Sequence, residues 1–150
     1  MKNIFSAPDS QEIINRINQL TPTTPQHWGK MGAAKMLAHC NVTYEMVYED
    51  KHFKPNILMR FILKTFVKNA VVNEKPYPHN SRTAPVFIIK EDKNFDVEKK
   101  RLIEHINKTQ ELGEDHFDGM ASHSFGMLNK NEWNNMFYKH LDHHLQQFGV

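Results

Sequence analysis

Apolar residues recur every three or four positions in five stretches of the chain, which is the spacing that gathers them on one face of an α-helix. The stretches are 10–20, 32–50, 56–71, 96–112 and 129–148. Asp9 or Ser10 can cap the first helix, Asp96 can cap the fourth, and Gly113 stands where a glycine commonly ends a helix. Residues 73–95 hold three prolines and one short apolar run, which predict a loop with a short extended piece. We therefore predict an all-α fold of four long helices and one shorter helix.

The stretch 56–71 combines apolar and basic residues at helical spacing. Its basic residues are Arg60, Lys64 and Lys68, and the apolar residues that we place opposite them are Ile57, Phe61, Leu63 and Phe66. This pattern predicts an amphipathic helix. The basic side is expected to be a solvated face, and contact with an anionic membrane or an acidic partner is the alternative.

The last helix carries two histidines on its apolar face. Trp133, Phe137 and Leu141 mark that face, and His140 and His144 fall within it because residues four apart lie one turn above the other. On the same helical wheel His143 lies at the edge of the stripe and Asp142 faces water. Two buried imidazoles on one face need a partner, and a shared metal ion is one.

A third histidine on the second helix would complete such a site. His39 lies at the border of that helix's apolar face, so it can reach into a cleft beside His140 and His144. Three neutral imidazoles around a divalent ion leave a position open for water or substrate. The alternative is a set of core histidines hydrogen-bonded to one another and to Gln147.

Four further residues are expected to surround the site. Gln147 and Thr43 lie on the two helices that supply the histidines, close to them in the helical repeat. His143 is expected at the rim, although its pairing with His140 stays open. His123, in a glycine-containing loop, either lines the mouth of the site or orders the loop.

Length and composition indicate one domain spanning residues 1–150, with 39% apolar and 24% charged residues. A formal net charge of +2 is too small to indicate nucleic-acid binding. No stretch resembles a signal peptide or a membrane span, and a single cysteine excludes an intramolecular disulfide. We expect a cytoplasmic protein in which Cys40 is a small buried hydrophobe and Trp28 and Trp133 are core anchors.

Two motifs resemble the DinB/YfiT-like superfamily of metal-binding four-helix proteins. They are Met36-Leu-Ala-His39-Cys and His140-Leu-Asp-His-His144-Leu-Gln-Gln147. The resemblance, to an uncharacterised branch of that superfamily, implies a four-helix bundle with a crossover connection and a short additional helix. It also implies that His39, His140 and His144 hold a divalent metal, with zinc or nickel favoured over iron or manganese. The chain departs from many relatives at Leu145-Gln146, where they have Arg-Gly.

The resemblance implies a small-molecule substrate and, as one candidate activity, transfer of a low-molecular-weight thiol. A metal-dependent hydrolase is the variant in the same site, but Leu141 follows His140 where hydrolases of the His-Glu-x-x-His kind place their base. A loop residue such as Glu114 or Asp115 is the remaining candidate base. A non-catalytic binding or stress-associated bundle and a peripheral membrane protein are the competing functions, and a homodimer stays open.

Overall fold

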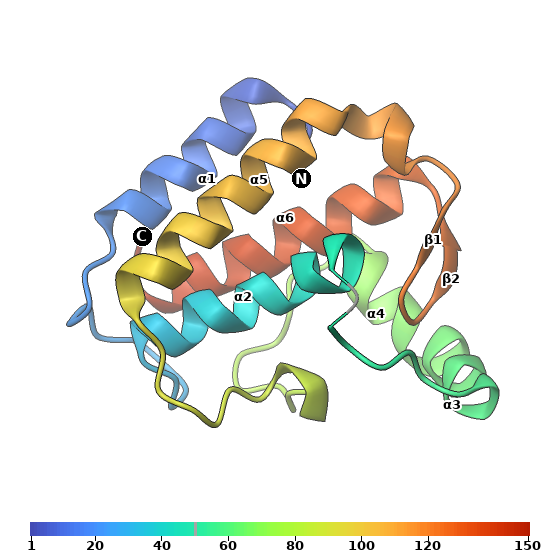
Figure 1. Cartoon of the computed structure of the whole chain (residues 1–150), viewed down its shortest axis with the longest axis horizontal. Helices are drawn as coiled ribbons and strands as arrows, with labels where there is room; N and C mark the ends of the chain where they lie inside the picture. Colours follow the sequence, from blue (N-terminus) through green and yellow to red (C-terminus); the bar gives the residue numbers. More distant parts are fainter. Residues whose placement is uncertain (50) are drawn as a thin grey trace.

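Four long helices form the body of the protein. The structure is a computed structural model that describes residues 1–49 and 51–150. The helices are α1 (Ala7–Gln19), α2 (Ala33–Tyr48), α5 (Phe95–Phe117) and α6 (Lys130–Gln147). Both α5 and α6 contact the other three long helices (Figure 1). The described chain is therefore mostly helical, as predicted.

The helices enclose one apolar core to which α6 contributes a continuous stripe. Trp133, Phe137, Leu141 and Leu145 are each at most 2% exposed. Asn129 caps α6 by accepting a hydrogen bond from the Glu132 backbone N–H, and the Glu132 carboxylate accepts one from the Asn129 N–H in return. This reciprocal cap fixes where α6 begins, and the buried stripe fixes which side of the helix faces the interior.

Helix ends differ from the prediction in three places. Helix α1 begins at Ala7, ahead of Asp9 and Ser10, because Pro8 is tolerated in a first turn. Asn94, and not Asp96, caps α5 through a hydrogen bond from the Val97 N–H. Gly113 only interrupts α5, adopting φ 73° and ψ 167° before the helix continues to Phe117. The predicted end of the second helix, at Asp50, lies outside the described residues.

A small hairpin occupies a segment that we predicted as loop. Strands β1 (Met120–Ser122) and β2 (Gly126–Leu128) pair antiparallel between α5 and α6. The prediction missed them because three-residue strands are too short to show an alternating pattern. The hairpin brings His123 beside the other functional candidates.

The connection from α2 to α5 contains a helical run followed by a long loop. The run comprises α3 (Ile57–Ile62), the π-helical turn η1 (Leu63–Val67) and α4 (Lys68–Val72). In Figure 1, α3 projects from the body of long helices. The prediction of a helix is confirmed, but its apolar side does not pack inward, since α3 and η1 bury none of their side chains.

The loop after this run returns over α2. It contains the 3₁₀ turn η2 (Pro85–Phe87) where we predicted an extended piece, because Pro85 favours the first position of a short turn. Phe87 points inward while Val86 and Ile88 stay exposed. No helix of the described chain is both long and apolar enough to cross a membrane.

Candidate metal centre

Three histidines from two helices meet inside the protein. Helix α2 supplies His39, and α6 supplies His140 and His144 one turn apart. One ring nitrogen of each lies within 4.8 Å of the other two, and the Nε2 atoms of His39 and His140 are 2.9 Å apart. The structure therefore brings together the three residues that the sequence singled out.

Carbonyl oxygens orient two of the three rings. His39 Nδ1 donates to the backbone oxygen of Phe87 at 2.9 Å, and His144 Nδ1 donates to Oε1 of Gln147 at 2.9 Å. Gln147 is itself held, because its amide nitrogen donates to the Trp28 carbonyl at 2.7 Å. A carbonyl oxygen can only accept, so both imidazoles carry their proton on Nδ1 and keep the Nε2 lone pair available.

The third ring has a partner that can act in either direction. His140 Nδ1 lies 3.0 Å from the Thr43 hydroxyl, which can donate or accept. Without a cation, His140 must place its proton on Nε2 to bond with His39, and Thr43 then donates. If His140 instead bound a cation through Nε2, its proton would lie on Nδ1 and the Thr43 hydroxyl would accept it. The donor set therefore fits a divalent cation, because Nδ1 of each ring has an oxygen partner that leaves the other ring nitrogen free to bind.

Burial keeps the histidines neutral. Loss of hydration lowers the pKa of His39, that of His140 still further, and that of His144 to about 3. Charge repulsion from His144 and His39 further lowers the pKa of His140, and repulsion from His39 further lowers that of His144, so neither ring readily becomes an imidazolium. Neutral imidazole is the form that binds metal ions.

The histidines line a cavity of roughly 880 Å³. Its size is that of a small-molecule site, and most of its walls are apolar. Apolar residues of the walls include Trp28, Met31, Val47, Val71, Phe87, Phe125 and Met136. Lys30, Lys35 and Arg82 also line the cavity, whereas no carboxylate does so among the described residues.

The other predicted site residues occupy different positions around the cavity. Thr43 and Gln147 contact the ligand rings and also line the wall. His143 lies at the rim, with its ring centroid 5.6 Å from that of Tyr77. His123 lines the wall and also bonds within its own turn, through Nδ1 to the Ser124 hydroxyl at 3.0 Å.

The acidic residues that we considered as bases do not line the cavity. We predicted that Asp142 faces water, but Arg16 of α1 covers it and forms an ion pair with it at 2.8 Å. Glu114 pairs with Lys130 at 2.6 Å, and neither it nor Asp115 lines the cavity. Cys40 is buried outside the cavity, as expected, and burial raises the pKa of its thiol. None of these groups reaches the histidines as a base or a nucleophile.

Trp28 lies in the cavity wall, whereas we predicted that it would anchor the core. It is half-buried in the cavity wall rather than in the core, and its ring stacks on His79 with centroids 3.8 Å apart. The next residue, Gly29, has φ 81°, and a Cβ there would lie 2.5 Å from Nε2 of Gln147. Only glycine leaves room for the Gln147 side chain at this position. The glycine that follows Trp28 was therefore the sequence signal that this segment lies against the site.

Comparison with known proteins identifies a family but no activity. A family model described as "Protein of unknown function (DUF1569)" matches residues 2–149. No curated protein and no solved structure matches the chain.

Proposed function

The chain belongs to the DUF1569 family, and we propose that it is a metal-dependent enzyme whose cation is held by His39, His140 and His144. The observation that carries this proposal is the set of three oxygen partners on the Nδ1 atoms. Metal-binding imidazoles are typically oriented in this way by a carbonyl or another oxygen behind the ring. Zinc and nickel suit three imidazoles best, and iron or manganese are the alternatives.

A DinB-like four-helix architecture is part of the proposal. It is supported by the order of the ligands along the chain, with one on α2 and two on the last helix, α6. The long connection from residue 49 to residue 94 is compatible with a crossover between α2 and α5.

Thiol transfer is the reaction that the cavity favours. A divalent cation held by these histidines would supply Lewis acidity, which would lower the pKa of a thiol or of water bound to it. Overall, a thiol RSH and an electrophile R′–X give RS–R′ and HX, so an S–C bond forms and a C–X bond breaks. No carboxylate among the described lining residues stands where hydrolases of the His-Glu-x-x-His kind place their base, which favours thiol transfer over hydrolysis of that kind.

The chain's own residues would bind the reactants, limit water and accept the thiol proton. His143 and His123 line the wall, and burial lowers the pKa of both. Each is therefore neutral near physiological pH and can accept a proton. Trp28 and Phe87 cover the apolar part of a substrate.

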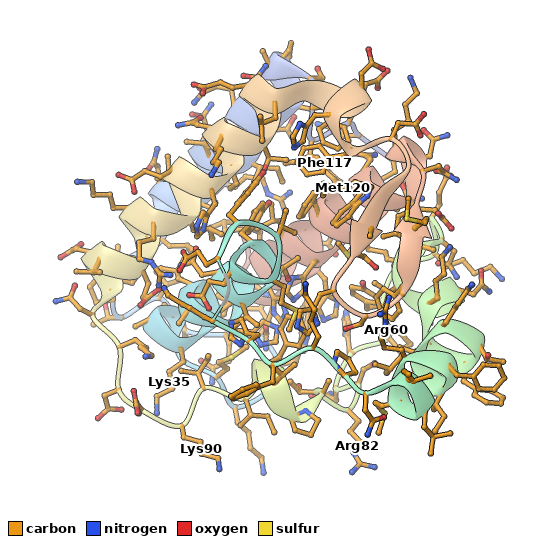
Figure 2. All side chains as sticks on the ribbon, turned by 45° about the vertical axis from the view of Figure 1, so that its right-hand side comes forward. Lys35, Arg60, Arg82, Lys90, Phe117 and Met120 are labelled. Atoms are coloured by element: carbon orange, nitrogen blue, oxygen red, sulfur yellow. The ribbon has the colours of Figure 1, made fainter. Side chains whose placement is uncertain are left out.

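The charge of the cavity indicates an anionic substrate. Lys30 and Arg82 form no ion pair with any described residue, and Lys35 pairs with the fully exposed Asp92 at 3.2 Å. Figure 2 shows Lys35, Lys90 and Arg82 along one side of the molecule. Cations beside apolar walls suit a thiol or electrophile that carries a carboxylate, sulfonate or phosphate.

Metal analysis tests the site. Protein purified without a histidine tag should contain about one divalent metal per chain, and His39→Ala and His144→Ala should each lose it because two imidazoles bind weakly. His116→Ala is the matched control, since His116 is exposed and lies outside the cavity. Equal metal content in the wild type and both ligand variants would refute the assignment.

Turnover tests the enzyme. A panel of anionic thiols and electrophiles, assayed with and without added zinc or nickel, should show metal-dependent product in at least one pairing. Replacement of Arg82 by Gln should raise KM for the anionic partner, whereas Lys90→Gln, outside the cavity lining, should not. If no pairing reacts in a protein that holds its metal, a non-catalytic metal-binding bundle is the better description.

A further inference from the structure

Residues 53–67 expose an unusual amount of apolar surface. We call this part of the chain the 53–67 segment. Its most exposed side chains are Phe53 (100%), Ile57 (88%), Phe66 (75%), Leu58 (69%) and Phe61 (64%). Monomeric proteins rarely leave so many large apolar side chains together in water, and such patches mark surfaces that bind another molecule or a membrane.

The segment is held firmly in this position. The Asn56 side chain caps α3 by accepting a hydrogen bond from the Met59 N–H at 2.8 Å. In α4, which follows the segment along the chain, Lys68 pairs with Glu132 of α6 at 2.7 Å. Lys139 of α6 donates to the Ala70 carbonyl of the same helix at 3.0 Å. Helix α4 is thereby fixed to α6, and α3 is presented as a formed helix that projects from the body (Figure 1).

The charge of this region is entirely positive. Residues 51–73 include five basic residues and no acidic residue. Arg60 and Lys64, which lie among the exposed apolar side chains, form no ion pair with any described residue. A helix with exposed Phe, Ile and Leu beside unpaired cations is typical of an interfacial membrane-binding helix.

Charge also argues against a second copy of the chain as the occupant. In a two-fold symmetric dimer the same patch faces itself, so the cations of one copy would face those of the other. An anionic bilayer suits both the apolar and the basic side chains of the segment. Its interface accepts the apolar side chains, and its headgroups attract Arg60 and Lys64.

We propose that the 53–67 segment docks this protein on anionic lipid membranes, with Phe53, Ile57, Leu58, Phe61 and Phe66 inserted at the interface and Arg60 and Lys64 on lipid phosphates. Val67 and Val71, at the end of the same helical run, line the histidine cavity. The docked protein would therefore hold one wall of that cavity close to the lipid.

Vesicle co-sedimentation tests the proposal with full-length protein. Wild type should bind vesicles of phosphatidylcholine mixed with phosphatidylglycerol and should bind pure phosphatidylcholine weakly. Ile57→Ser with Phe61→Ser should weaken binding at least about tenfold through lost apolar contact. Arg60→Gln with Lys64→Gln should weaken it roughly fivefold per cation, and added salt should reduce wild-type binding in the same way.

The controls separate this surface from the rest of the molecule. Val97→Ser with Met127→Ser removes two exposed apolar side chains, 53% and 65% exposed, from other elements and should leave binding unchanged. All variants should keep the wild-type helical circular dichroism and metal content, so failure here is distinguishable from failure of the proposed metal site. The proposal would be overturned if the wild type stayed in the supernatant, or if both segment variants bound as well as the wild type. A dimer that dissociates only in the Ile57→Ser with Phe61→Ser variant would also overturn it.

Discussion

Helix α6 and the run from α3 to α4 carry similar amphipathic patterns but lie in opposite surroundings. Phe137 of α6 is fully buried, because α1, α2 and α5 all pack against that helix. Phe61 of α3 is 64% exposed, because the body contacts this run through α4. A hydrophobic period therefore predicts a helix, but what covers the apolar side depends on packing partners that can lie outside the chain.

The largest expected effect is on stability, and it tests this contrast directly. Phe137→Ala should lower the free energy of unfolding by about 3–5 kcal/mol, since it leaves a cavity beside Tyr44 and Trp133. Phe61→Ala should change the free energy of unfolding by less than about 0.5 kcal/mol, because the Phe61 side chain is mostly exposed and fills no space in the core. Urea unfolding of both variants measures the difference. A large loss in Phe61→Ala would mean that the 53–67 segment is covered in solution.

Lys139 connects the two regions and gives a smaller, pH-dependent effect. Burial lowers the pKa of Lys139 to about 8 from an ordinary value of 10.5. Between these pH values the unfolded chain binds more protons than the folded chain, so the free energy of unfolding should rise with pH. The slope contributed by Lys139 is at most about 1.4 kcal/mol per pH unit.

Urea unfolding from about pH 8 to about pH 10 measures this slope, with Lys139→Met as the comparison. The variant cannot titrate, so it should lack the part of the rise that wild type shows. Identical slopes would indicate that Lys139 is already well solvated in the folded protein. Its hydrogen bond to the Ala70 carbonyl would then hold α4 less firmly than the structure indicates.

Much of the helical body could be predicted from the sequence, because its helices are long and strongly periodic. The histidine cluster could be predicted for the same reason, since the buried stripe of α6 pointed two imidazoles inward. The exposure of Ile57, Phe61 and Phe66 could not be predicted, because periodicity carries no information about the neighbour of a helix face. The Asn94 cap was missed because Asp96, two residues later, is an equally good capping type.

The surroundings of the histidines were harder to predict than the histidines themselves. The partner of His39 is the backbone oxygen of Phe87, 48 residues away, and a backbone oxygen has no side-chain signature. The same holds for the Trp28 carbonyl that positions Gln147 from 119 residues away. Both contacts depend on loops whose paths follow from the packed fold rather than from local pattern.

The smallest expected effect concerns Thr43, whose hydroxyl faces the Nδ1 atom of His140 on buried α6. Thr43→Val keeps the shape of the side chain but removes the acceptor that stabilises the metal-binding tautomer. Zinc affinity, measured by competition with a chelator, should fall about tenfold, at the lower end of the range for such supporting residues. Thr43→Ser keeps the hydroxyl and should retain near-wild-type affinity. Equal affinity in the Val and Ser variants would show that helix packing alone orients His140, whereas a loss in Val alone would show that a buried helix face needs specific polar support as well.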